Sequence, residues 1–383
     1  MLLKSLSFED KQTGWKLENL RLDRFNLLVG ASGVGKTRIL RAIRTVHRIG
    51  RGLFLRNFNQ GVSFDIHFEH EGQTYRWQFD SAAHSPGSGD DEESAAALAD
   101  DRPIVVAESL HSDVDGLLVK REQSQFLFRN KELPMLNRHS SALQLLDEPS
   151  INQLKQAFAK SFLEALDSQS TTHRIIDAQD WAARKFPSLD SLRSYTDRPP
   201  VVKAFVLQER FAAQFDKLKQ LFIDIFPTVV DVAVARRESG TMQGRAMEHL
   251  SFKLKEHGVP KWIRAEDISS GMARTLNHLV DLMLAPAGTV VLIDEFENSL
   301  GVNCMGPLTD FILSRANDLQ FVITSHHPYI INNIPKSHWK LVRRKGSTVR
   351  VTPASEIPAL QGPSAQDDFI RLINSPEFEE GME

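Results

Sequence analysis

The sequence predicts an α/β fold built around a phosphate-binding loop, and three observations support this prediction. Residues 30–37, Gly-Ala-Ser-Gly-Val-Gly-Lys-Thr, fit the pattern G-x-x-x-x-G-K-[ST]. Residues 289–295 form an apolar run that ends in two adjacent carboxylates. Segments 62–68 and 74–79 alternate apolar and polar side chains around a Glu-Gly pair, which is typical of a β-hairpin with one buried face. We therefore expect an α/β fold with an antiparallel part beside the phosphate-binding part. At 383 residues the chain is long enough for two or three folding units, and one elaborated α/β domain is the alternative.

The flanks of the loop match a nucleotide site. Residues 26–29 predict a short buried strand, and residues 38–43 carry apolar side chains at helical spacing, so the loop joins a strand to a helix. The loop glycines let successive backbone N–H groups turn inward around an anion, and the helix N-terminus adds its dipole. Lys36 can reach the β- and γ-phosphates, and the Thr37 hydroxyl can bind Mg²⁺. The predicted contacts to ATP are Gly30, Ala31, Ser32, Gly33, Val34, Gly35, Lys36, Thr37 and Arg38.

The carboxylate pair is the second strong signal. Asp294 and Glu295 follow the apolar strand predicted at residues 290–293. In a phosphate-loop NTPase the first carboxylate helps to hold Mg²⁺. The second points to the opposite side, where it can polarise a water for in-line attack on the γ-phosphate. An apolar run before Asp-Glu is weak evidence alone, but behind a matched phosphate loop it predicts Asp294 as a metal ligand and Glu295 as the catalytic base.

Composition excludes several classes of protein. The net charge is −3, so the overall charge does not favour binding to nucleic acid or to an anionic membrane. A local basic patch could still exist at this net charge. Cys304 is the one cysteine, which excludes an internal disulfide and a cysteine-based zinc site and suits a cytoplasmic protein. No apolar run approaches the ~20 residues of a membrane helix, and the N-terminus is unlike a signal peptide. We expect no membrane association.

The other elements are predicted from periodicity. Strand-like segments occupy residues 2–8, 16–29, 103–108, 229–235, 250–255 and 321–325, and helices are expected at 271–284 and 305–316. Helical spacing extends from Asn152 to Phe222 without a sustained heptad seam, so a long coiled coil is not expected. Residues 81–101 are small, polar and acidic, which predicts a disordered loop.

Three further motifs resemble those of ABC-type ATPases of the SMC-like and OLD-like branch. Residues 267–274, Asp-Ile-Ser-Ser-Gly-Met-Ala-Arg, resemble the signature motif. Residues 324–329, Thr-Ser-His-His-Pro-Tyr, resemble the switch-histidine motif, and residues 297–300 stand where the D-loop follows the catalytic Glu. With the phosphate loop and the carboxylate pair, the order is that of the family. The resemblance implies a P-loop NTPase of ABC ATPase type, with a mixed sheet, an antiparallel β subdomain and a helical insertion.

The resemblance also implies how the residues act. Two heads would sandwich two ATP molecules, so that Ser269, Ser270 and Gly271 of one head cap the γ-phosphate bound to the other. His326 would contact the γ-phosphate and order the attacking water, with His327 as a rival for this role. The signature lacks the second Gly and the Gln of the transporter form. The Q-loop glutamine stays open among three candidates, Gln73, Gln123 and Gln125.

The same resemblance predicts the organisation of the chain. Residues 1–110 would form the first part of the ATPase head, 111–225 a mainly helical insertion, 226–355 the second part of the head, and 356–383 an acidic tail. The chain lacks the long coiled coil of SMC heads, and too few residues follow His326 for the TOPRIM domain of OLD nucleases.

The chain is similar to ATPase subunits of anti-phage systems, such as Septu-type, PARIS-type and retron-associated ones. This predicts a Mg²⁺-dependent ATPase that dimerises and controls a separate nuclease or toxin. The alternative is a RecF-like or SMC-like DNA-binding clamp, in which basic residues of the loop helix could face phosphates: Arg41, Arg44, Arg48, Arg51 and Arg56. The same arginines could instead lie on a helix face that contacts only solvent, which is the more common arrangement. A third alternative, an inactive scaffold that binds ATP without hydrolysing it, is disfavoured because Asp294, Glu295 and His326 are all present.

Overall fold

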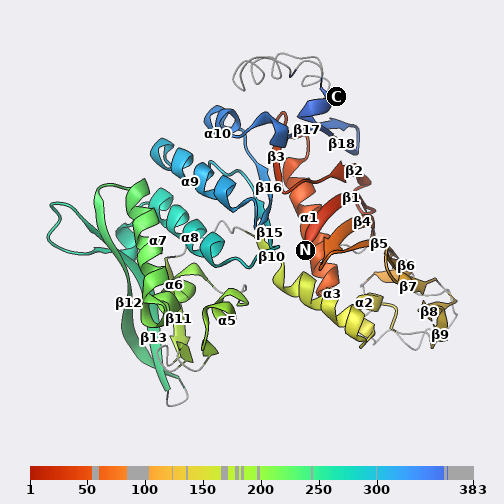
Figure 1. Cartoon of the computed structure of the whole chain (residues 1–383), viewed down its shortest axis with the longest axis horizontal. Helices are drawn as coiled ribbons and strands as arrows, with labels where there is room; N and C mark the ends of the chain where they lie inside the picture. The colour runs from red at the N-terminus through yellow and green to blue at the C-terminus, as the bar shows by residue number, and fades with distance from the viewer. Residues whose placement is uncertain are drawn as a thin grey trace, which may run out of the picture. The chain divides into compact units, whose positions relative to one another are not determined.

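The computed structural model of the chain divides into two compact units, and Figure 1 shows its elements. Unit 1 comprises Met1–Phe162 and Pro335–Glu383, and unit 2 comprises Leu163–Ile334. The structure describes residues 1–53, 60–83, 103–122, 124–134, 137–164, 171–176, 181–182, 185–195, 199–242, 245–298, 300–357 and 360. The predicted acidic loop from residue 84 onward, the tail from residue 361 onward, Arg56 and Gln123 lie outside the described residues.

Unit 1 is a mixed sheet with helices. Its strands follow the order β3-β17-β18-β2-β1-β4-β5-β6-β7-β8-β9 across the sheet. Pairing is parallel between β3 and β17 and between β18 and β2, and antiparallel from β2 through to β9. Its elements are β1 (Leu2–Asp10), β2 (Trp15–Arg21), β3 (Phe25–Val29), α1 (Lys36–Gly50), β4 (Val62–His70), β5 (Gln73–Ala82), β6 (Ile104–Ser112), β7 (Gly116–Arg121), β8 (Phe126–Phe128), β9 (Lys131–Leu133), α2 (Ala142–Leu145), α3 (Pro149–Lys160), β17 (Trp339–Lys345) and β18 (Thr348–Pro353), with β10 (Phe162–Glu164) beginning at the unit boundary.

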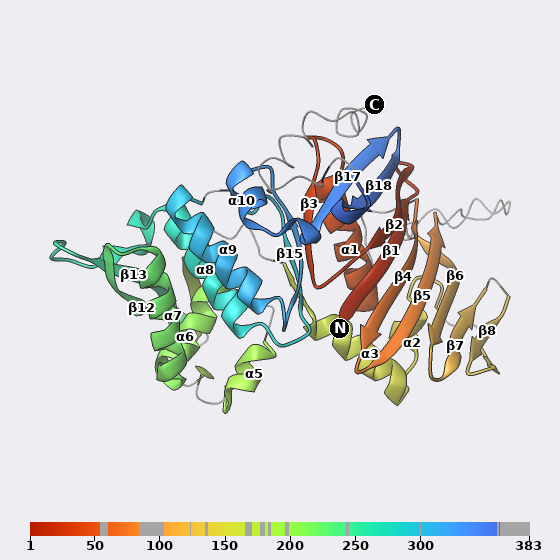
Figure 2. The ribbon, with the colours of Figure 1, turned by 45° about the horizontal axis from the view of Figure 1, so that its top comes forward.

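The alternating segments form the predicted hairpin. Strand β4 buries every second side chain, and its Phe64 lies opposite Phe79 of β5. These two rings stack with centroids 5.1 Å apart, and the Trp77 ring meets Phe64 edge-on at 4.9 Å. Such cross-strand aromatic pairs fix the register of the sheet. The segment predicted at 16–29 is interrupted, because β2 ends at Arg21 and β3 begins at Phe25. Figure 2 shows β2, β1, β4, β5 and β6 side by side.

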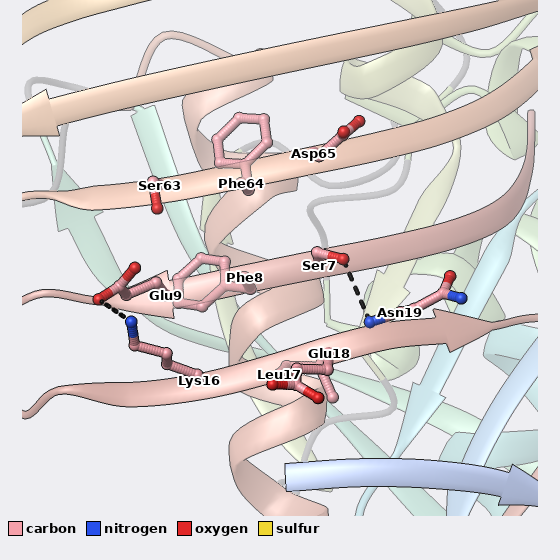
Figure 3. Close-up of a pocket in the computed structure, with 10 residues that line it drawn as sticks. All are labelled: Ser7, Phe8, Glu9, Lys16, Leu17, Glu18, Asn19, Ser63, Phe64 and Asp65. Atoms are coloured by element: carbon pink, nitrogen blue, oxygen red, sulfur yellow. Dashed lines mark hydrogen bonds and ion pairs between the residues drawn. The ribbon is translucent and has the colours of Figure 1, made fainter. Parts of the chain in front are cut away.

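A hollow of about 430 Å³ opens over β1, β2 and β4, and Figure 3 shows the residues that line it. It lies where the register of β1 and β2 shifts. The Glu9 carboxylate pairs with the Lys16 ammonium at 3.0 Å, and the Asn19 N–H donates to Ser7 Oγ at 3.1 Å. Asp65 pairs with Arg76 of β5, and Glu18 pairs with Arg350 of β18. Because these polar groups have partners and none belongs to a predicted nucleotide motif, we attribute the hollow to the sheet irregularity.

Unit 2 combines a parallel strand pair with a small antiparallel sheet. Strands β15 and β16 are parallel, with Leu292 opposite Val322. The second sheet has the order β11-β13-β12, with β14 also paired to β13. The elements of this unit are β11 (Thr172–Ile176), α5 (Leu189–Arg193), α6 (Pro200–Arg210), α7 (Ala212–Ile225), β12 (Val229–Met242), β13 (Arg245–Glu256), β14 (Ile263–Arg264), α8 (Ser270–Leu284), β15 (Val290–Ile293), α9 (Val302–Arg315), β16 (Gln320–Thr324) and α10 (Pro328–Asn333).

Helices α6 and α7 cover one face of the small sheet, as Figure 1 shows. The side chains of Phe252 and Leu254 on β13 and of Val232 and Val234 on β12 are buried beneath them. Helical spacing correctly predicted α3, α6 and α7. It was wrong for Phe162–Glu164, which forms β10, and for Thr172–Ile176, which forms β11 and pairs with β13. Among the described residues, no helix is long and apolar enough to cross a membrane.

A buried ion pair joins α6 to α8. Lys203 Nζ lies 2.7 Å from Asp281 Oδ1, and the two side chains are only 5% and 8% exposed. Replacing Asp281 with alanine should lower the free energy of unfolding by about 3–5 kcal/mol, because it leaves a buried ammonium without its counter-charge. Urea unfolding followed by circular dichroism measures this change.

Two variants test the cause of that loss. The double variant Lys203→Met/Asp281→Leu should recover most of the stability, since it removes both charges. Asp216→Ala removes an exposed carboxylate that pairs with Lys219 on α7, while Asp231 still pairs with Lys219, and this change should cost at most about 1 kcal/mol. Equal losses for Asp281→Ala and Asp216→Ala would contradict the assignment of Asp281 as a buried partner.

Candidate functional site

The phosphate loop of unit 1 lies between β3 and α1, as the sequence predicts. All five residues of β3 are buried, and Gly35 is the N-cap of α1 with φ 106°. The Ile39 N–H donates to the Gly35 carbonyl at 3.0 Å, which closes the first helical turn. The loop therefore ends at a helix N-terminus, where backbone N–H groups without helical partners can bind an anion.

The Lys36 side chain is held inside this loop. Its Nζ donates to the carbonyl oxygens of Gly30 at 2.7 Å and Ala31 at 2.9 Å, and the residue is 5% exposed. Thr37 is half-buried in the first turn, while Ser32, Gly33 and Arg38 are exposed and Val34 is buried. The ammonium is thus fixed within the loop before any ligand binds, which favours phosphate binding because little side-chain freedom remains to be lost.

Close packing explains the first loop glycine. A Cβ on Gly30 would lie 2.6 Å from the carbonyl oxygen of Val342 on β17, and its φ of 153° is one that other residues rarely adopt. The next residues along β17 also approach the loop. Arg344 Nη1 lies 3.5 Å from the Gly33 carbonyl oxygen, an approach that sequence reasoning missed because more than 300 residues separate the two positions.

The carboxylate pair of unit 2 follows β15, again as predicted. Thr324, the last residue of β16, holds both residues of the pair: its Oγ1 donates to Asp294 Oδ1 at 2.6 Å and accepts from the Glu295 N–H at 2.8 Å. Asp294 is half-buried and Glu295 is exposed. Glu295 adopts φ 45°, the left-handed conformation that is uncommon for a residue with a side chain. The strand end therefore presents two carboxylates with a constrained backbone between them.

The signature segment forms the N-terminus of α8. Ser269 is the N-cap, and its side chain accepts from the Met272 N–H at 3.3 Å. Ser269 and Ser270 are exposed and Gly271 is half-buried, so this helix end faces solvent. The hydrogen bond from the Met272 N–H to the Ser269 side chain is an ordinary N-cap that stabilises the helix, and by itself it does not indicate a ligand site. Exposed N–H groups on a helix of this length, however, also meet the requirement for an anion contact.

The two adjacent histidines have different surroundings. His327 is the N-cap of α10, and its Nδ1 accepts from the Tyr329 N–H at 3.2 Å. His326 is exposed, and its backbone N–H donates to Glu297 Oε1 at 2.6 Å. His327 Nδ1 thus serves the cap of α10, and the role of His326 at the γ-phosphate stays a prediction.

Three residues at this site, Thr324, Glu297 and Arg274, lie inside the motifs named from the sequence but had no predicted role. Thr324 and Glu297 connect the carboxylate pair to the histidine loop. Arg274 on α8 reaches the backbone of the carboxylate pair. Their places in these motifs did not reveal the contacts that they make. Unit 2 thus brings Asp294, Glu295 and His326 into one network.

The Q-loop glutamine remains open. Gln73 begins β5 and accepts a hydrogen bond from the Tyr75 hydroxyl at 2.6 Å. The carbonyl of Gln125, next to β8, accepts from the Glu122 N–H at 2.9 Å. These contacts are local to the antiparallel strands of unit 1, and they give no reason to prefer either residue.

The donor atoms fit Mg²⁺. A threonine hydroxyl and an aspartate carboxylate are hard oxygen ligands, and Mg²⁺ usually takes one or two protein ligands with phosphate and water oxygens completing the octahedron. Asp294 Oδ1 accepts a hydrogen bond from the Thr324 hydroxyl at 2.6 Å, which orients this carboxylate at the strand end. Within the described part of the chain, no group of three or more His, Cys, Asp or Glu side chains forms a site made by protein alone.

A solved structure of an SMC head shares this fold. The chain aligns with the structure described as "Crystal structure of the SmcHead bound to the C-winged helix domain of ScpA" at a TM-score of 0.53 and 12% identity, covering 92% of this chain and 97% of that one. The Thermotoga maritima SMC head domain aligns at 0.43 with 9% identity, covering 92% and 99%, and the Pyrococcus furiosus Smc head at 0.45 with 12%, covering 92% and 96%. The fold is a mixed α/β P-loop NTPase fold that resembles an SMC head, with a small antiparallel sheet added.

A family model supplies the assignment. No curated protein matches the chain. Residues 25–332 match the model described as "AAA domain, putative AbiEii toxin, Type IV TA system", a range that runs from β3 and the phosphate loop to the histidine motif. Since this match spans well over half of the sequence, the protein belongs to this family of AAA domains.

Proposed function

We propose that the protein is a Mg²⁺-dependent ATPase whose heads form an ATP-sandwiched dimer and control a separate effector, a nuclease or toxin, in anti-phage defence. The observation that carries the ATPase assignment is the phosphate loop with Lys36 fixed inside it at a helix N-terminus. The defence role is supported by the family description, which names a toxin and a toxin–antitoxin system.

The residues divide the chemistry between them. Thr37 and Asp294 are the proposed ligands of Mg²⁺, which when bound neutralises charge on the β- and γ-phosphates. Glu295 accepts a proton from the attacking water. The water oxygen bonds to the γ-phosphorus, and the bond from that phosphorus to the bridging oxygen breaks with ADP as the leaving group. His326 orders the water, and Ser269, Ser270 and Gly271 of a second head supply anion contacts to the γ-phosphate.

The mass of a Glu295→Gln variant in solution tests the sandwich. This variant should bind ATP without completing hydrolysis, so the dimer accumulates. Size-exclusion chromatography with light scattering should show the mass double on addition of ATP and Mg²⁺, and adding Ser269→Arg to the same variant should prevent the doubling because it places a large side chain at the capping helix end. A Glu295→Gln protein that stays monomeric with bound ATP would contradict the sandwich.

A nucleic-acid clamp is the second candidate, and one surface favours it. The face of the small sheet opposite α6 and α7 carries Lys253 directly across from Arg264 of β14, and Arg237 across from His249. The exposed Trp262 ring lies beneath the Lys253 ammonium at 4.4 Å. Basic and aromatic side chains on one open sheet face suit phosphates and bases.

Binding to duplex DNA separates the two candidates. A clamp should bind DNA without any partner, with an affinity that falls steeply with salt and drops further in the Lys253→Glu/Arg264→Glu variant. A defence ATPase should instead hold a stable complex with its effector protein. The trapped Glu295→Gln dimer is suitable bait for capturing that effector.

A further inference from the structure

The signature helix is tied to the carboxylate pair by one buried side chain. Arg274 lies on α8, one turn after the helix N-terminus, and is 2% exposed. Its Nη2 lies 3.3 Å from the Glu295 carbonyl oxygen and 3.5 Å from the Asp294 carbonyl oxygen. The 3.3 Å contact is the stronger one, since hydrogen bonds weaken as the distance approaches 3.5 Å.

The other side of the guanidinium is also fixed. Arg274 Nε donates to His278 Nε2 at 3.3 Å, one turn further along the same helix. Burial and the neighbouring Arg274 charge lower the pKa of His278 to about 3, so the imidazole is neutral at pH 7 and its Nε2 can accept this hydrogen bond. The guanidinium plane is therefore oriented by its own helix before it reaches the carboxylate strand.

One of the two residues whose carbonyls Arg274 contacts has an uncommon backbone conformation. Glu295 has φ 45°, a conformation that persists in a non-glycine residue only where surrounding contacts impose it. Its N–H is held by Thr324 Oγ1 at 2.8 Å and its carbonyl by Arg274. The Phe296 N–H donates to the Thr324 carbonyl at 3.0 Å, and these contacts together set the direction of the Glu295 side chain.

We propose that Arg274 is a positioning residue that couples the N-terminus of α8 to the orientation of Glu295. The inference rests on the proposed function: α8 of one head caps ATP bound to a second head, whereas Glu295 acts on ATP bound to its own head. Displacement of α8 on capping is carried through the Arg274 guanidinium to the Glu295 peptide. The two ATP sites of a dimer are thereby linked, so that a head hydrolyses its own ATP once it has capped its partner's.

The first measurement is steady-state hydrolysis. Arg274→Gln should lower kcat by about 100-fold, the loss expected when a catalytic group is misplaced by about 1 Å, and should leave ATP affinity unchanged. Arg274→Lys keeps the buried charge and one donor and should recover part of the rate. Arg315→Gln is the matched control, because Arg315 also donates to a backbone carbonyl in unit 2, that of Ala285 at 3.3 Å, but lies on α9.

Epistasis separates positioning from general destabilisation. If Arg274 acts through Glu295, Arg274→Gln should cause no further loss of hydrolysis in the Glu295→Gln background. An equal further loss in both backgrounds, or an unchanged kcat in Arg274→Gln, overturns the inference. If Arg274→Gln fails to fold, Arg274→Lys takes its place in the same comparison, and a wild-type rate for that variant overturns the inference as well.

A readout without hydrolysis keeps this test independent of the proposed function. Hydrogen exchange of the peptide covering residues 293–298 should be faster in Arg274→Gln than in the wild type and unchanged in Arg315→Gln. Unchanged exchange in Arg274→Gln overturns the positioning role even for a protein without ATPase activity. A wild-type protein that hydrolyses no ATP, yet shows faster exchange in the variant, overturns the proposed function alone.

Discussion

Replacing Lys36 with alanine is expected to lower the affinity for ATP by about 100-fold or more. The carbonyls of Gly30 and Ala31 fix the Lys36 ammonium inside the loop. Its positive charge attracts the phosphates there, in addition to the hydrogen bonds that the backbone N–H groups of the loop donate. Hydrogen bonds to charged groups contribute about 1.5–3 kcal/mol each, and the β- and γ-phosphates offer two acceptors. Titration with a fluorescent ATP analogue or isothermal calorimetry measures the change.

A second lysine gives the control for this prediction. Lys345 ends β17 in the same unit and is exposed, so Lys345→Ala changes the net charge equally without touching the loop. Its affinity for ATP should stay within about twofold of wild type, since exposed charges interact weakly. If Lys36→Ala binds ATP as tightly as Lys345→Ala, the loop does not bind the phosphates in the way we propose.

The phosphate loop and the carboxylate pair could be predicted from sequence because both are local codes. The phosphate loop is one short continuous segment that contains Gly30, Gly35 and Lys36 and directly follows β3. The apolar run before Asp294 forms β15, which ends at Ile293. The hairpin of β4 and β5 was equally accessible, since alternation and a Glu-Gly turn specify it locally. In each case, neighbouring residues carry the information.

Other features depend on residues that are distant along the chain. Strands β17 and β18 lie between β3 and β2 in the sheet, an order that no local pattern encodes. Strand β11 lies within the segment of helical spacing, but it is extended and pairs with β13, which is distant along the chain. The contacts of Arg274 to main-chain carbonyls were equally hidden, because a carbonyl oxygen is present at every residue and carries no sequence signature.

Glu295→Gln is expected to lower kcat by about 10²–10⁴-fold, the usual contribution of a general base, while ATP binding persists. The amide keeps the size of the side chain and the Thr324 contact to the backbone, but it cannot accept a proton from the attacking water. Phosphate release after a single mixing of ATP with excess protein measures the chemical step directly. Glu209→Gln on α6 removes an exposed carboxylate in the same unit and serves as the matched control.

The result also decides between the residues that surround the attacking water. Hydrolysis of ATP by Glu295→Gln at the wild-type rate would remove Glu295 from the chemistry and leave His326 as the remaining candidate base. Slow hydrolysis with tight ATP binding would show that the carboxylate is needed after binding, at the step where the water is deprotonated. Thr324 contacts the Asp294 carboxylate and the Glu295 N–H, and neither contact involves the Glu295 side chain. If Glu295→Gln lowers kcat and leaves ATP affinity unchanged, the loss therefore comes from the Glu295 side chain and not from the metal ligand Asp294.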